Sequence, residues 1–233
     1  MQGMLLVDKP AGWTSFDVVN FVRRIVATVD GKKPKNCKVG HTGTLDPFAT
    51  GLLVLLIGKD YTKRASELSK LDKTYEVTMK LGQTSTTGDP EGEITDLAGG
   101  SKIPSADEIE AAFANFRGEI QQVPPAYSAI KIDGQRAYKL ARAGKEVVIE
   151  PRKVTINRLE ITSYNYPEVK FVADVSSGTY IRTLSEDIGK ILGTGAYTTQ
   201  LRRTSVGKFN IENAIETAKI DENSLRARLG TLA

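Results

Sequence analysis

The spacing of apolar residues predicts both helices and strands along the chain. Residues 18–29 place apolar side chains at helical intervals, behind a Thr14 or Ser15 that can cap the first turn. Residues 73–81 alternate apolar and polar side chains, as a strand with one buried face does. Residues 52–57 form an unbroken apolar run of the kind found in a fully buried strand. The chain therefore contains both types of element.

The same criteria predict the remaining elements. We expect helices over 63–71, 105–116, 135–143 and 179–192 and a weak C-terminal helix, and strands over 4–7, 147–161, 169–175 and 205–209. No repeat, low-complexity tract or change of composition divides the chain. We therefore expect one α+β domain built on a large mixed or antiparallel sheet.

Composition narrows the class of protein. The chain has 233 residues, of which 40% are hydrophobic, and its mean hydropathy of −0.25 is that of a folded globular protein. One cysteine, Cys37, excludes an internal disulfide framework, and one histidine, His41, excludes a histidine-rich metal site. The longest apolar run is too short to span a bilayer, and Asp8 and Lys9 precede any signal-like segment. We expect a cytoplasmic protein that needs no metal and no cofactor.

The charge is unevenly distributed. The net charge is +4, but residues 21–73 carry +6, residues 76–125 carry −6, residues 126–158 carry +5 and residues 178–210 carry +3. Three basic stretches that converge on one face could bind a polyanion such as nucleic acid. The alternative is an ordinary solvated surface.

The segment 40–51, Gly-His-Thr-Gly-Thr-Leu-Asp-Pro-Phe-Ala-Thr-Gly, is the best candidate for chemistry. Its glycines permit close approach of a ligand to the main chain, and Asp46 is its only carboxylate. No second acid is nearby to form a glycosidase-like pair, and no Ser/His/Asp set can be assigned. Asp46 would thus act as a lone nucleophile or base, unless its carboxylate only caps its own turn.

This segment resembles the catalytic motif of the TruB family, the tRNA pseudouridine(55) synthases. Further segments resemble the family's other motifs in the expected order: Leu5-Leu6-Val7-Asp8-Lys9-Pro10-Ala11-Gly12-Trp13-Thr14-Ser15, Lys73-Thr74-Tyr75, Pro124-Pro125-Ala126-Tyr127-Ser128-Ala129-Ile130-Lys131, Gly178-Thr179-Tyr180-Ile181-Arg182-Thr183-Leu184, and Leu201-Arg202-Arg203-Thr204 with Val206-Gly207. The resemblance implies the pseudouridine synthase core, a mixed sheet flanked by helices with a central catalytic cleft.

The resemblance also implies roles for individual residues. Asp46 is the essential aspartate, Arg182 pairs with it, and Tyr75 stacks on the flipped uracil. The residues implied to line the uracil pocket or to contact RNA are Tyr180, Leu201, His41, Lys9, Lys131 and Arg142. Physical arguments agree in part, because an arginine in the first turn of a helix favours an anion and a base stacks well on an aromatic ring.

Each of these residues also has a plain structural alternative. Arg182 could pair with Glu186 one turn further along its helix, and Tyr75 could be an ordinary core residue. The sequence leaves open whether Asp46 adds to the base, adds to the sugar or removes a sugar proton.

The family resemblance predicts a catalytic domain over residues 1–210, with an RNA-gripping basic segment at about 124–152. Residues 211–233 would form a short tail rather than a full PUA-type domain. The expected partner is the T arm of tRNA; we expect a monomer with no membrane association and no obligate protein partner. The alternatives are a synthase for a different RNA and a protein that only binds or folds tRNA.

Overall fold

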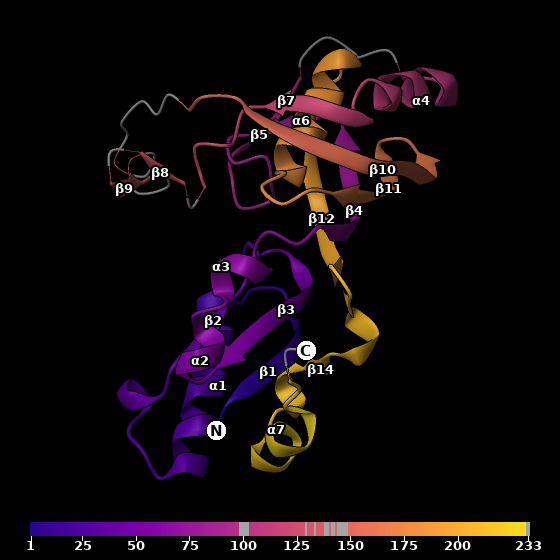
Figure 1. The fold of residues 1–233 in the computed structure, drawn as a ribbon. Helices are drawn as coiled ribbons and strands as arrows, with labels where there is room; N and C mark the ends of the chain where they lie inside the picture. The colour runs from indigo at the N-terminus through magenta and orange to yellow at the C-terminus, as the bar shows by residue number, and fades with distance from the viewer. Residues whose placement is uncertain are drawn as a thin grey trace. The chain divides into compact units, whose positions relative to one another are not determined.

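The computed structural model describes residues 1–97, 103–128, 130–132, 134–137, 140, 143 and 149–231 (Figure 1). Ten strands form a mixed sheet and helices accompany it, so the predicted α+β class is confirmed. The chain divides into two compact units, which are described one at a time: unit 1 is Met1–Tyr75 with Leu201–Ala233, and unit 2 is Glu76–Gln200. No helix of the described ranges is long and apolar enough to cross a membrane. The central cleft stays a prediction.

Unit 1 is built around the N-terminal half of the chain. Its helices are α1 (Ser15–Asp30), α2 (Lys59–Thr62), α3 (Ala65–Leu68) and α7 (Glu222–Arg228), with 3-10 turns at Pro34–Asn36, Ile211–Asn213 and Thr217–Lys219. Its strands are β1 (Gly3–Lys9), β2 (Val39–His41), β3 (Thr50–Ile57), β13 (Phe209–Asn210), β14 (Ile215–Glu216), the start of β4 (Lys73–Leu81) and the end of β12 (Ala196–Val206). The strand order is β14-β1-β3-β12-β4, and β2 pairs with β3. β3 runs antiparallel to β1 and parallel to β12.

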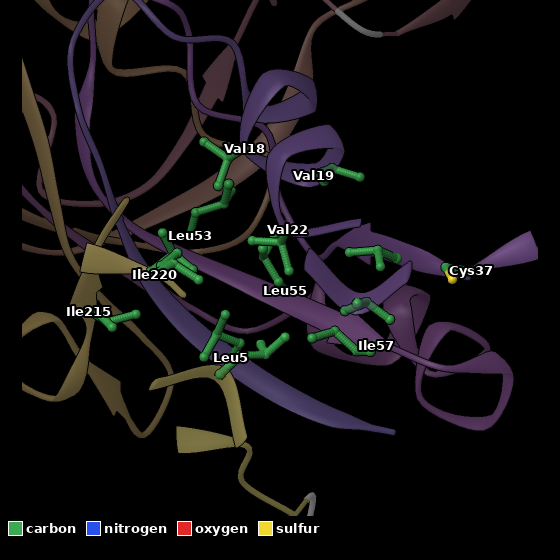
Figure 2. Close-up of a cluster of buried hydrophobic side chains, with 14 of the residues drawn as sticks. Leu5, Val18, Val19, Val22, Cys37, Leu53, Leu55, Ile57, Ile215 and Ile220 are labelled. Carbon is green, nitrogen blue, oxygen red and sulfur yellow. The ribbon is translucent and has the colours of Figure 1, made fainter. Parts of the chain in front are cut away.

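The core of unit 1 lies between α1 and the sheet. Thr14 caps α1 by accepting a hydrogen bond from the Asp17 main-chain nitrogen, as its position before the apolar repeat predicts. Figure 2 shows Val18 and Val22 of α1 pointing towards Leu53 and Leu55 of β3, and all four are buried. The helical repeat therefore packs on the alternate side chains of a central strand, which fixes the first residues of α1 against the sheet.

Unit 2 contains the rest of the sheet in the order β12-β4-β11-β10-β7. Its own strands are β7 (Gly118–Gln122), β10 (Arg152–Asn165) and β11 (Glu168–Val175), with two small hairpins, β5 (Gln83–Ser85) with β6 (Ile94–Asp96) and β8 (Lys131–Ile132) with β9 (Gln135–Arg136). Its helices are α4 (Ala106–Ala114) and α6 (Ile181–Ile191). Phe113 of α4 meets Phe171 of β11 edge to face, with ring centroids 5.2 Å apart, so α4 packs on the sheet.

Three sequence predictions were wrong in part. A helix over 63–71 is reduced to α3, preceded by the separate turn α2. The predicted helix 135–143 begins as strand β9, and residues 138, 139, 141 and 142 lie outside the described residues. The predicted strand 205–209 covers only the end of β12, which begins at Ala196, and the start of β13. The first part of β12 was missed because buried polar side chains such as Thr198 and Arg203, held by hydrogen bonds, remove the alternation that marks a strand.

The core contact between α1 and β3 can be tested with Leu55→Ala, which removes a side chain with 0% exposure from the centre of the cluster. The lost burial and the cavity left behind should lower the free energy of unfolding by about 2–5 kcal/mol. Urea unfolding followed by circular dichroism measures this loss. The matched control is Arg24→Ala on the exposed side of α1, expected within about 0.5 kcal/mol of wild type. Equal loss in both variants would contradict this account of the core.

Candidate active site

The loop that carries Asp46 joins β2 to β3; we call residues 41–51, which include the last residue of β2 and the first two of β3, the Asp46 loop. The Thr42 main-chain nitrogen donates to Val54 O (3.1 Å), and the Ala49 nitrogen donates to Asp46 O (3.1 Å), which closes a turn around Pro47. Asp46 itself is half-buried. The carboxylate therefore lies on a turn between two strands of the sheet, β2 and β3.

Arg203 of β12 ties the first arm of this loop to strand β3. Its side chain is 2% exposed, and its guanidinium donates to Leu52 O (2.8 Å), Gly43 O (3.0 Å) and Thr44 O (3.3 Å). A buried guanidinium is stable only when its N–H groups have acceptors, and here main-chain carbonyls supply them. The fit requires glycine at position 51, where φ is +104° and a Cβ would lie 2.3 Å from Arg203 O.

Two further buried side chains hold the middle of the loop. The Leu45 main-chain nitrogen donates to Ser15 Oγ (2.8 Å), and Ser15 Oγ donates to Leu45 O (3.0 Å). Lys9 has 0% exposure, and its Nζ donates to Trp13 O (2.6 Å), Pro10 O (2.8 Å) and Pro47 O (3.3 Å). The Gly12 nitrogen also donates to Pro47 O (2.8 Å). The residues on both sides of Asp46 are thus bonded to the segment between β1 and α1.

Tyr75 lies near the start of β4, two residues after a buried lysine. Tyr75 is 8% exposed, and Lys73 Nζ donates to Ser69 O (2.7 Å) and to Leu71 O. Burial, and to a lesser degree the nearby Arg203 charge, lowers the pKa of Lys73 to about 8. The strand that carries Tyr75 therefore begins at a lysine that is held by two carbonyls and whose charged form is disfavoured by burial.

In unit 2, Arg182 occupies the first turn of α6 and is 4% exposed. Its guanidinium donates to Thr87 O (2.6 Å) and Tyr127 O (2.9 Å) and forms an ion pair with Asp89 Oδ2 (3.1 Å). Asp89 is 3% exposed, and its Oδ1 accepts from Thr87 Oγ1 (2.6 Å) and the Glu91 nitrogen (3.0 Å). Each group of the pair is thus held by several bonds, which fixes the guanidinium in position.

The remaining predicted site residues are placed as follows. Tyr180 caps α6, where its nitrogen donates to Gln122 Oε1 (2.7 Å) and its carbonyl accepts from Gln122 Nε2 (3.0 Å). Leu201 is 8% exposed in β12, and His41 is partly exposed at the end of β2. Arg142 lies outside the described residues, and of Lys131 only the main chain, in β8, is described. Within the described ranges no three His, Cys, Asp or Glu side chains are grouped as metal ligands.

Sequence reasoning missed the residues that hold the site. Arg203 stood within a recognised motif without an assigned role, Ser15 was considered only as a helix cap, and Asp89 lay outside every predicted helix and strand. Their partners lie 30 to 160 residues away in the chain. No local pattern encodes such contacts.

Comparisons with known proteins identify the family of this chain. Residues 31–181 match the family model described as TruB family pseudouridylate synthase (N terminal domain), and residues 182–230 match the tRNA pseudouridylate synthase B C-terminal domain. The tRNA pseudouridine synthase B of Burkholderia mallei is 46% identical over 235 residues, which cover all of this chain and 74% of that protein. The protein of the same name from Mycobacterium sp. (strain KMS) is 48% identical over 91% of this chain and 69% of its own.

Among solved structures, the crystal structure of a Cbf5–Nop10–Gar1 complex contains a chain with the same fold. The match has a TM-score of 0.68 and 29% sequence identity, and it covers 92% of this chain and 52% of that one. A structure of an H/ACA RNP bound to a substrate RNA matches with a TM-score of 0.65 and 27% identity, over 93% of this chain and 51% of that one.

The buried lysine before Tyr75 predicts a dependence of stability on pH. Below about pH 8, Lys73 is charged in both the folded and the unfolded chain, so the full cost of its burial is present. Between about pH 8 and its ordinary pKa of 10.5, the folded chain loses the proton while the unfolded chain keeps it. The unfolded state then binds more protons, so stability gains a contribution that rises with pH. We expect Lys73→Met to lose this contribution.

Urea unfolding at pH 7, 8, 9 and 10 measures the effect as a difference between variants. Lys70→Met, at an exposed neighbouring position, is the matched control and should follow wild type. If Lys73→Met showed the same change in stability with pH as the control, the account of Lys73 would be wrong.

Proposed function

This chain belongs to the TruB family and is a tRNA pseudouridine synthase, and we propose that it converts uridine 55 in the T loop of tRNA to pseudouridine with Asp46 as the essential residue. The observation that carries the proposal is the anchoring of the Asp46 loop. Main-chain groups of Gly43, Thr44, Leu45 and Pro47 are all bonded to side chains of the core. A carboxylate on a loop fixed in this way can meet a substrate without reorganisation.

The reaction is an isomerisation. The bond between N1 of uracil and C1′ of ribose breaks, the base turns, and a bond forms between C5 and C1′. The hydrogen on C5 leaves as a proton, and N1 gains one, so atoms and electrons balance without an oxidant or reductant. Asp46 supplies the nucleophile or base that the cleavage requires.

Arg182 is proposed to pair with Asp46 and keep its carboxylate ionised and oriented. Support comes from the way Arg182 is itself held, because Asp89 and two carbonyls take up part of its guanidinium and fix its direction. A carboxylate beside a fixed guanidinium stays charged at neutral pH. Asp89 is then a positioning residue for the reaction, acting through Arg182.

The uracil itself is proposed to stack on Tyr75, with Tyr180 and Leu201 lining its pocket. Flipping a base out of its stack costs a few kcal/mol, so an aromatic partner and a contact that fills the vacated space are needed. His41 is proposed to make the contact that fills the space vacated by the flipped base, since it ends β2 where the Asp46 loop begins. Lys9, which has no exposed surface, is proposed to position Pro47 rather than to touch RNA.

Recognition of the T arm is assigned to the basic segment at about 124–152, with Lys131 and Arg142. Looped RNA is the usual target of specific recognition because its bases can be splayed out. We further propose that the catalytic domain spans residues 1–210, that the protein acts as a cytoplasmic monomer, and that it needs no metal, cofactor or obligate protein partner.

The first test follows tritium released from C5 of the uridines of a T-arm stem-loop RNA. Wild type should release one equivalent without added metal or cofactor. Asp46→Asn should lower release by at least about 10⁴-fold, because it removes the reacting carboxylate, while RNA affinity stays within a few-fold. A substrate whose position 55 is cytidine is the control. Binding without release by wild type would leave an RNA-binding protein or a synthase for a different RNA.

A second test concerns the anchoring of the loop by Arg203. Arg203→Lys keeps the charge but offers a point donor in place of a planar fork, so it cannot serve three carbonyls in the same geometry. Because a small displacement of a reacting group costs up to about 100-fold, we expect the single-turnover rate to fall roughly 10- to 100-fold. The dissociation constant for RNA should change less than threefold.

The matched control is Arg202→Lys, at a half-buried position where the arginine pairs with Asp8. Its rate should remain within threefold of wild type. Thermal unfolding establishes that both variants are folded at the assay temperature. Equal loss of affinity and rate in Arg203→Lys would show that Arg203 does not act through the Asp46 loop.

A further inference from the structure

The outward side of α1 carries a phenylalanine that the core does not use. Phe16 is 57% exposed, although the preceding residue, Ser15, is buried and bonded to Leu45 of the Asp46 loop. A single exposed apolar residue is common in proteins and needs no explanation on its own. The position of this one is specific, because its immediate neighbour in the helix, Ser15, makes the bonds that hold the Asp46 loop.

A fixed arginine accompanies the ring. The Arg23 guanidinium carbon lies 5.6 Å from the centroid of Phe16. Its side chain donates to Asn20 Oδ1 (2.7 Å) and to Val39 O (3.1 Å). These bonds hold the guanidinium between α1 and β2, so the aromatic ring and the cation form one preorganised surface.

The charge around this surface is positive. Residues 31–45 contain four lysines and no Asp or Glu, and Lys38, next to Val39, is exposed. Unit 1 as a whole has 18 Lys and Arg against 11 Asp and Glu, a net +7. The carboxylate nearest in sequence to Phe16 is Asp17, which accepts hydrogen bonds from Thr14 N and Oγ1 in the helix cap. Those bonds lower the pKa of Asp17, so it is one fixed negative charge beside the patch.

We propose that Phe16, Arg23 and Lys38, the α1 patch, form a second binding surface for the substrate RNA. The inference rests on the proposed function and deepens it. Phe16 stacks an unpaired base near the target uridine, while Arg23 and Lys38 contact the phosphates beside that base. An aromatic face next to a held arginine and an exposed lysine matches the chemistry of single-stranded or looped nucleic acid, in which planar bases alternate with negative charges.

The experiment compares wild type, Phe16→Ala, Phe16→Trp and Lys38→Ala in the full chain. Fluorescence anisotropy measures the dissociation constant for a labelled T-arm stem-loop RNA at 50 to 300 mM salt. Phe16→Ala should raise the dissociation constant roughly five- to 100-fold, with the salt dependence unchanged, since stacking carries no charge. Phe16→Trp should restore affinity. Lys38→Ala should reduce the slope of log affinity against log salt by about 0.7–0.9.

The matched control is Ile191→Ala on α6, an apolar residue of similar exposure (53%) in the other unit. Its affinity should equal that of wild type. If Phe16→Ala bound RNA within twofold of wild type, the α1 patch would be overturned. If poly-glutamate competed as well as unstructured RNA of equal charge, the patch would be a surface for acidic polymers, and the proposal would again fail.

Tritium release by wild type on the same RNA separates the two proposals. Release with no effect of Phe16→Ala on affinity overturns the α1 patch alone. Lack of release from wild type overturns the proposed function, whatever the binding curves show.

Discussion

The Asp46 loop depends on a cation that the core buries. Arg203 takes the carbonyls of Gly43, Thr44 and Leu52, so the first arm of the loop and strand β3, which follows it, are bonded to a single side chain of β12. Removing a guanidinium from water is costly, and only a complete set of acceptors offsets that cost. The geometry of the loop is therefore tied to the register of β12 against β3, where Arg203 pairs with Gly51. A slip of one residue would turn Arg203 to the other face of the sheet and leave three carbonyls without a donor.

Unit 2 also buries an arginine, and there a carboxylate is among its partners. Arg182 also donates to main-chain carbonyls, but its charge is compensated by the buried carboxylate of Asp89. A buried ion pair is weak evidence for stability, because desolvation offsets the attraction. The ion pair instead fixes the orientation of the Arg182 guanidinium, because several bonds hold each partner. The Asp46 loop and Arg182 are thus each held in position by contacts within their own unit.

Sequence reasoning succeeded where one face of an element is apolar. The repeat of α1 and the alternation of β4 follow directly from packing on a core, and both were predicted with nearly correct bounds. It failed at β12, whose buried positions include Thr198, bonded to Ser185, as well as Arg203. Asp46 and Arg182 remain predictions from motif resemblance. The residues that hold them were missed because their partners are carbonyls and carboxylates brought close only by the fold.

Helix α1 carries both Ser15, which holds the Asp46 loop, and the exposed Phe16. Successive residues of a helix point about 100° apart, so Ser15 can face the Asp46 loop while Phe16 faces solvent. The apolar stripe of Val18 and Val22 against β3 fixes the helix, and with it both of these side chains. Packing of α1 on β3 thereby sets the position of the Asp46 loop on one side of the helix and of the exposed Phe16 ring on the other. A substrate RNA held at Phe16 would be held relative to Asp46 by the rigidity of one helical turn.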